Sequence, residues 1–178
     1  MPLNDAALVA RVLLEDDHHA FAELVRNHQS TVRGLLRQLT RCDFALADDL
    51  AQETFLRAYK NIRSFRGEAK FSTWLYRIAY NCFREEARKR KELVGIDESQ
   101  LEAEQDPQTV DPGLKHDLMH ALQLLPLPER SAILLCCQNG LSHDEAARVL
   151  DIPLGTVKTN VLRGREKLKK TLAAWGPA

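Results

Sequence analysis

The sequence predicts an all-α protein made of two small helical domains that are joined by a flexible acidic linker. Apolar residues recur with a period near 3.6 along most of the 178 residues, and no sustained alternation typical of a half-buried strand is present. Between Gly95 and Gly113 the chain reads GIDESQLEAEQDPQTVDPG, which has many acids, no basic residue and two prolines. Helical patterns then resume. We therefore assign residues 1–94 to the first domain, 95–113 to the linker and 114–178 to the second domain.

Four helices are expected in the first domain. The first two are separated by the acidic residues that follow Leu14, and Ser72 is a candidate N-cap for the fourth because its hydroxyl can accept from a free amide. The spacing of apolar residues predicts helices over Asp5–Leu14, His18–Leu39, Ala47–Ile62 and Ser72–Lys91.

Four shorter helices are expected in the second domain. Ser142 and Glu145 form the S-x-x-E pattern of a capping box, and Asp151 to Pro153 break the helix that it starts. A short helix, a tight turn and a basic helix predict a helix-turn-helix. The expected ranges are Leu114–Leu124, Pro128–Gln138, Ser142–Leu150 and Leu154–Leu172.

The last of these helices divides into two faces at 100° per residue. Val157, Val161, Gly164 and Leu168 share one side and should be buried. Leu162 lies on the opposite side. In a major groove a leucine can make an apolar contact with a thymine methyl, and neighbouring cations can bind guanine or phosphate. The residues expected at duplex DNA are Gly155, Thr156, Lys158, Thr159, Leu162, Arg163 and Lys167.

The fourth helix and the loop before it interleave aromatic rings with cations. Leu75, Ala79 and Cys82 lie on the core side of that helix, whereas Trp74 and several arginines follow another side. A surface that binds single-stranded nucleic acid typically combines aromatic rings, which stack on exposed bases, with cations, which contact the phosphate backbone. The alternative is that the rings pack in the core and the arginines extend into solvent.

The third helix has a different, acidic face. Its acidic side chains would repel phosphate beside a nucleic-acid surface, so this face is predicted to contact a protein. It consists of Asp48, Asp49, Gln52, Glu53 and Tyr59.

Two long motifs in this order resemble the extracytoplasmic-function, or group four, sigma factors of bacterial RNA polymerase, which belong to the sigma-70 family. They are DDLAQETFLRAYKNIRSFRGEAKFSTWLYRIAYN and LPLPERSAILLCCQNGLSHDEAARVLDIPLGTVKTNVLRGREKL. The resemblance implies sigma domain two, a linker and sigma domain four, and a transcription initiation factor that directs core polymerase to specific promoters. It places Asp49, Gln52 and Glu53 on the clamp helices of the β′ subunit, and it implies a second contact with the β flap.

The resemblance also implies how the promoter is read. The second domain would contact the −35 duplex, and the first would capture a base flipped from the melted −10 strand. The −10 residues implied are Arg63, Ser64, Phe65, Arg66, Lys70, Phe71, Trp74, Arg77, Asn81, Arg84 and Arg88. The competing interpretation is a stand-alone helix-turn-helix repressor or activator that binds DNA tightly without polymerase.

Other function classes find little support. Net charge is zero, the acidic N-terminus does not resemble a signal peptide, and no run of about 18 apolar residues could span a membrane. We therefore expect a cytoplasmic protein with no membrane insertion. When free, it is expected to be a monomer. The four cysteines lie in apolar patterns and are expected to be buried thiols. His116 and His120 are four residues apart on a helix, but no further ligand completes a zinc site. We expect no cofactor, no enzymatic activity and, from the family resemblance, an anti-sigma partner.

Overall fold

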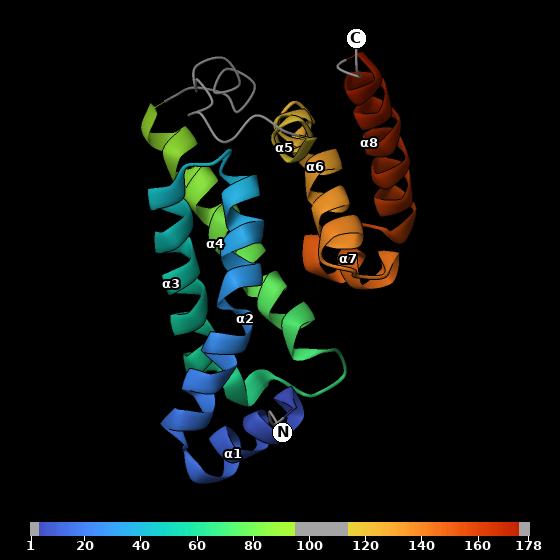
Figure 1. Ribbon diagram of the computed structural model, residues 1–178. Coiled ribbons are helices and arrows are strands. Elements are labelled where there is room, and N and C mark those ends of the chain that lie inside the picture. The colour runs from blue at the N-terminus through green and yellow to red at the C-terminus, as the bar shows by residue number, and fades with distance from the viewer. Residues whose placement is uncertain (1–3, 95–113, 175–178) are drawn as a thin grey trace.

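The computed structural model describes residues 4–94 and 114–174, which form helices and no β-strand. Figure 1 shows the helices gathered into two bodies, α1 to α4 and α5 to α8. This confirms the all-α class and the two-domain organisation. The predicted linker, 95–113, lies outside the described residues, and the exact domain boundaries stay a prediction.

The first body contains α1 (Asp5–Glu15), α2 (His18–Leu39), α3 (Phe44–Asn61), the short 3₁₀ turn η1 (Ile62–Ser64) and α4 (Phe71–Val94). Helices α2, α3 and α4 pack side by side, and α1 covers one end of α2. Leu24, Leu35 and Leu75 are fully buried between them. Burying each such side chain stabilises the fold by roughly 1.5–3 kcal/mol.

The starts of α3 and α4 differ from the sequence prediction. α3 begins at Phe44 because the Asp43 carboxylate accepts from the Leu46 amide at 3.0 Å. α4 begins at Phe71, and the Trp74 amide donates to the Lys70 carbonyl at 3.2 Å. The prediction of Ser72 as N-cap is therefore wrong, because Ser72 already lies inside the helix.

The second body contains α5 (Leu114–Gln123), α6 (Leu127–Ile133), the π-helical turn η3 (Leu134–Gln138), α7 (His143–Leu150) and α8 (Leu154–Ala174). The capping box predicted for Ser142 and Glu145 is confirmed, since the Ser142 hydroxyl accepts from the Glu145 amide and the Glu145 carboxylate accepts from the Ser142 amide. The single helix predicted over Pro128–Gln138 is instead an α-helix that widens into a π-helix. Leu134, Val149 and Val157 form the centre of this core.

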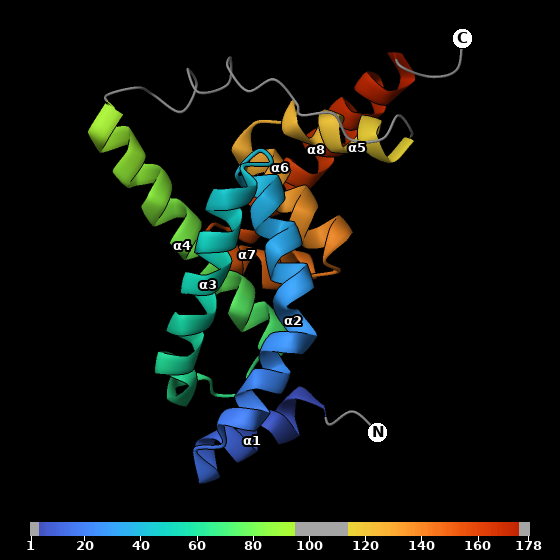
Figure 2. The same ribbon diagram turned by 60° about the vertical axis from the view of Figure 1, so that its left-hand side comes forward.

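The two bodies pack against each other. α4 contacts α7, and α2 contacts α5, α6 and η3. Figure 2 shows the second body behind α2 to α4, on the side away from α3. The structure is thus a closed arrangement of the two domains.

No helix within residues 4–94 and 114–174 combines the length and the apolar character needed to cross a bilayer.

Candidate nucleic-acid interface

The second helix of the helix-turn-helix, α8, presents the face that its sequence predicts. Val157, Val161 and Gly164 are buried against the rest of the domain, whereas Leu168, predicted on the same side, is half-buried. Leu162 keeps 60% of its surface exposed, which leaves an apolar side chain on the outside of a basic helix. The predicted neighbours on that face are all exposed: Gly155, Thr156, Lys158, Thr159 and Arg163.

Local contacts fix the angle at which α8 leaves α7. α7 ends at Leu150, and the next residue, Asp151, caps it in the left-handed conformation at φ 56°. The Ile152 amide then donates to the Ala147 carbonyl at 3.2 Å. The Pro153 carbonyl accepts from the amides of Thr156 and Val157 and so starts α8 at once. The turn between the two helices is therefore held by backbone hydrogen bonds.

One residue of the predicted duplex surface is directed elsewhere. The Lys167 ammonium donates to the Glu129 carboxylate of α6 at 2.8 Å. Glu129 is 7% exposed, so this ion pair ties α8 to α6. In this structure Lys167 holds the recognition helix in place, and its charge is already paired.

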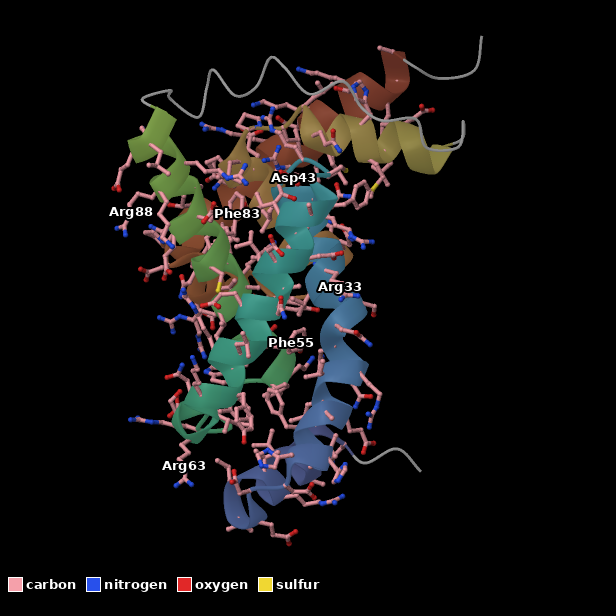
Figure 3. The ribbon with its side chains drawn as sticks, turned by 90° about the vertical axis from the view of Figure 1, so that its left-hand side faces the viewer. Arg33, Asp43, Phe55, Arg63, Phe83 and Arg88 are labelled. Atoms are coloured by element: carbon pink, nitrogen blue, oxygen red, sulfur yellow. The ribbon has the colours of Figure 1, made fainter. Side chains whose placement is uncertain are left out.

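The arginine side of α4 is exposed as predicted. Arg77, Asn81, Arg84 and Arg88 all reach solvent, while Trp74 at the start of the same side is half-buried. In Figure 3 the labelled Arg88 and Arg63 point outwards near opposite ends of the first domain. The loop residues Arg63, Ser64, Arg66 and Lys70 are exposed too.

The aromatic residues of the preceding loop form a cluster with one another. The Phe65, Phe71 and Trp74 ring centroids lie 5.4 to 5.6 Å apart, and His28 of α2 packs on Phe71 at 5.5 Å. Phe71 is 4% exposed. The expectation that its ring faces DNA is therefore wrong for this structure, since Phe71 anchors the loop to the core.

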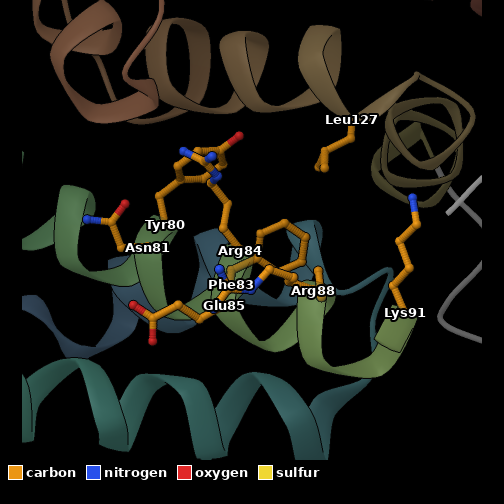
Figure 4. A pocket seen from close by; sticks show the side chains of 9 residues that line it. Tyr80, Asn81, Phe83, Arg84, Glu85, Arg88, Lys91 and Leu127 are labelled. Carbon is orange, nitrogen blue, oxygen red and sulfur yellow. The ribbon is translucent and has the colours of Figure 1, made fainter. Parts of the chain in front are cut away.

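A groove of about 400 Å³ runs between α4 and the start of α6. Tyr80, Asn81, Arg84 and Arg88 line one side, and Leu127 of α6 faces them (Figure 4). Three predicted −10 residues thus share one concave, basic surface. Leu127 was missed by the sequence analysis, because only the packing of the two domains brings it there.

The acidic face of α3 is partly neutralised by basic neighbours. Asp48 lies 3.5 Å from Arg33 and 3.6 Å from Arg37. Asp49 and Gln52 are exposed, and the Tyr59 hydroxyl is 2.8 Å from His18 Nδ1.

Glu53 is fixed by a bridge between α3 and α4. Arg57 donates to Glu53 at 2.6 Å and contacts Glu85 of α4 at 2.8 Å. The hydrogen bond from Arg57 lowers the pKa of Glu53, and it keeps the carboxylate ionised in one position. The sequence spacing of Glu53 and Arg57 could have predicted their pairing, whereas the contact with Glu85 depends on helix packing.

The cysteines and histidines form no metal centre among the described residues. Cys82 is buried as expected, but Cys42 and Cys136 are half-buried and Cys137 is exposed, so the prediction of four buried thiols is wrong. Burial raises the pKa of Cys136 to about 11. The side chain of His116 lies outside the described part of the structure, so the histidine pair is not tested.

Comparisons with known proteins agree with these features. The family model Sigma-70 region 2 matches residues 24–92, and Sigma-70, region 4 matches residues 115–168. The chain is 34% identical over 185 residues to the ECF RNA polymerase sigma-E factor of Haemophilus influenzae, covering 96% of each chain. It is 37% identical over 170 residues to the ECF RNA polymerase sigma factor SigW of Bacillus subtilis, covering 88% of this chain and 90% of that one.

Two solved structures are similar across both domains. The sigma factor RpoE in complex with the anti-sigma factor NepR from Bartonella quintana has a TM-score of 0.74 at 26% identity, covering 86% of this chain and 96% of that chain. CnrH in complex with the cytosolic domain of CnrY has a TM-score of 0.69 at 26% identity, covering 96% and 97%.

Proposed function

The chain belongs to the extracytoplasmic-function group of the sigma-70 family and is a promoter-directing initiation factor of RNA polymerase, and we propose which of its surfaces carry out each step. The outer face of α8 reads the −35 duplex. The arginine side of α4, with the loop before it, captures the melted −10 strand. The acidic face of α3 docks on the polymerase.

The observation that carries the −35 assignment is the exposed Leu162 between Lys158 and Arg163. An exposed leucine favours the helix but buries no apolar surface, whereas a thymine methyl in the major groove offers it an apolar contact. The flanking cations supply the phosphate contacts and counterion release on which affinity depends.

The −10 assignment is supported by the groove beside α4. Asn81 carries both hydrogen-bond donors and an acceptor, so it can pair with the edge of an extruded base. Tyr80 adds a ring, and Arg84 and Arg88 add positive charge along the same side. Extrusion costs a few kcal/mol, which stacking and hydrogen bonding in such a groove can offset.

The polymerase assignment is supported by Asp49 and Gln52, which are exposed on α3 and flanked by the fixed carboxylate of Glu53. We place this face on the β′ clamp helices and assign a second contact, with the β flap, to the second domain. A stand-alone repressor does not need such a face, and the similarity to polymerase sigma factors over both domains disfavours that alternative.

Other parts of the proposal follow from the family. The chain acts in the cytoplasm as a monomer when free, has no enzymatic activity of its own and needs no cofactor. Two similar structures are complexes with an anti-sigma factor or a partner's cytosolic domain, which supports an anti-sigma partner here.

The test uses Arg163→Ala, with Arg165→Ala as the matched control on the same helix. Arg165 is also exposed, but it lies off the predicted face and its guanidinium is 3.6 Å from Cys137 Sγ. Promoter binding by the polymerase complex should weaken by about 1–3 kcal/mol for Arg163→Ala if that side chain reads a base edge. Arg165→Ala should lose little affinity. If Arg163→Ala loses equal affinity for the specific promoter and for unrelated DNA, Arg163 contacts phosphate and does not read a base.

A further inference from the structure

One end of the first domain contains both α1 and the loop that leads from η1 into α4, as Figure 1 and Figure 2 show. Leu8, Val9 and Val12 of α1 are buried, and α1 packs on α2 and contacts η1, where the loop begins. The helix precedes residues 24–92, which match Sigma-70 region 2, so the family match gives it no role. Its position makes α1 a candidate support for the loop.

His28 of α2 connects α1 to this loop. Its Nε2 atom lies 2.9 Å from Oδ2 of Asp5, at the start of α1. An ionised carboxylate can only accept a hydrogen bond, so Nε2–H is the donor. The imidazole is 13% exposed, and it also packs on Phe71, whose ring centroid lies 5.5 Å away at an interplanar angle of 57°. Asp5 therefore fixes the orientation of a ring that supports Phe71.

Phe71 belongs to a cluster of three rings that holds both ends of the loop. Phe65 follows η1 and Phe71 begins α4, and their ring centroids lie 5.5 Å apart in an edge-to-face arrangement. The Trp74 ring lies 5.4 Å from Phe65 and 5.6 Å from Phe71. Between the two phenylalanines the loop contains the exposed Arg66 and Lys70, which we assign to −10 DNA. The position of these cations therefore depends on how the three rings pack.

The packing of the rings affects binding because a loop that is disordered in the free chain must lose conformational entropy when it binds DNA. If only a fraction of the chains hold the loop in the binding position, the apparent affinity falls by that fraction. One aromatic pair contributes a factor of roughly two to ten to an equilibrium constant. Loss of the contact between His28 and Phe71 can weaken −10 capture by up to this factor.

We propose that His28 is a positioning residue for the −10 loop. Asp5 of α1 holds the imidazole against Phe71, and the imidazole keeps the three-ring cluster, and with it the cations of the loop, in the position that captures DNA. This inference rests on the −10 assignment under Proposed function. It gives α1 a role in promoter opening, although we assign no residue of α1 to the DNA surface.

Two variants of the full chain remove the support, and each has a matched control on its own helix. His28→Ala removes the ring and the donor, whereas His19→Ala removes an exposed histidine of α2. Asp5→Ala removes the acceptor at a side chain that is 35% exposed, whereas Glu15→Ala removes an exposed carboxylate of α1. A third variant, His28→Phe, restores a ring against Phe71 without the donor.

Trp74 reports directly on the cluster. The chain has two tryptophans, so a Trp175→Phe background leaves Trp74 as its sole tryptophan. Acrylamide quenching of its fluorescence in the free chain measures how well the cluster shields the indole, and circular dichroism measures folding. A pull-down measures binding to core polymerase. Permanganate reactivity of unpaired thymines measures opening of a duplex promoter that is selected from random DNA with the parent holoenzyme.

We expect His28→Ala to raise the quenching constant of Trp74 and, at equal binding to core polymerase, to lower the yield of open complex by roughly two- to tenfold. Asp5→Ala should change both in the same direction but by less, because the ring remains. His28→Phe should return both close to the parent values, which a general loss of stability would not do. His19→Ala and Glu15→Ala should match the parent chain.

The support of the cluster is refuted if a folded His28→Ala chain shows the same Trp74 quenching as His19→Ala, or if His28→Phe does not restore the shielding. Should His28→Ala not fold, the comparison of Asp5→Ala with Glu15→Ala decides in the same way. Stronger quenching with unchanged promoter opening would overturn the role in −10 capture. Failure of the −10 assignment itself is seen separately, as normal opening of a closed promoter by Asn81→Ala, which leaves the Trp74 readout of His28 unaffected.

Discussion

Gly164 lies where α8 packs tightly on Ile133 of α6, and replacing it by alanine tests how tightly α8 is held. A Cβ at this position would lie 2.8 Å from Ile133 Cγ1, 3.3 Å from Ile133 Cδ1 and 3.5 Å from the Glu129 carbonyl. Carbon atoms pack best at about 3.5–4.0 Å, so either Ile133 or α8 must move by roughly 0.7 Å or more.

The net effect is the difference of two opposing terms. Ile133 is 5% exposed, and a β-branched side chain in a helix has one strongly preferred rotamer, so it has little freedom to move aside. Overpacking of this kind costs about 1–3 kcal/mol. Replacing a glycine by alanine in a helix interior stabilises the helix by about 1 kcal/mol. We therefore expect Gly164→Ala to destabilise the second domain by about 1 kcal/mol, which lowers its melting temperature by roughly 4–8 °C.

Gly34→Ala is the matched control. Gly34 is also in the interior of a helix, α2, but a Cβ there meets nothing within 4 Å. Only the helix propensity changes at this position, so the free energy of unfolding of this variant should rise by up to about 1 kcal/mol. Thermal and urea unfolding of the full chain, followed by circular dichroism, compares the two. If Gly164→Ala is stabilised as much as Gly34→Ala, the α6–α8 contact yields easily and does not fix the position of α8.

Two further predictions concern the first domain. Asn81→Ala should fail to open a closed promoter yet recover on a template already unpaired at −10, because the cost of extruding the base is then already met. Permanganate reactivity of unpaired thymines measures this, and normal opening of the closed promoter would place the capture site elsewhere. Asp49→Lys should lose binding to core polymerase in a pull-down while Glu15→Lys, at an exposed site on α1, retains it. Undiminished binding by a well-folded Asp49→Lys chain would exclude the acidic face of α3 as the docking surface.

The features that sequence predicted well are those set by neighbouring residues in the chain. The buried and exposed faces of α8 follow from helical periodicity alone, so Val157 and Leu162 were placed on opposite sides. The capping box was predictable for the same reason, since Ser142 and Glu145 are three residues apart and satisfy each other.

Two of the differences from the sequence-based prediction involve a partner that lies far away in the chain, whereas the wrong N-cap at Ser72 is a local error. Phe71 has the composition of a base-stacking surface, but His28 of α2 and the Phe65 and Trp74 rings enclose it. Composition indicates which side chains could contact a nucleic acid, but it does not show which of them are buried in the core. Lys167 is a second example, because its partner Glu129 belongs to a helix that precedes it by a long stretch of chain.

Glu145 shows why such long-range roles escape a sequence-based prediction even when the local prediction is correct. The capping box explains why a glutamate lies three residues after Ser142, so the sequence gives no reason to expect a second role for Glu145. A carboxylate, however, has two oxygens, and the cap uses Oε2 while Oε1 accepts from Thr73. A residue whose local role is fully satisfied can therefore still contact the other domain.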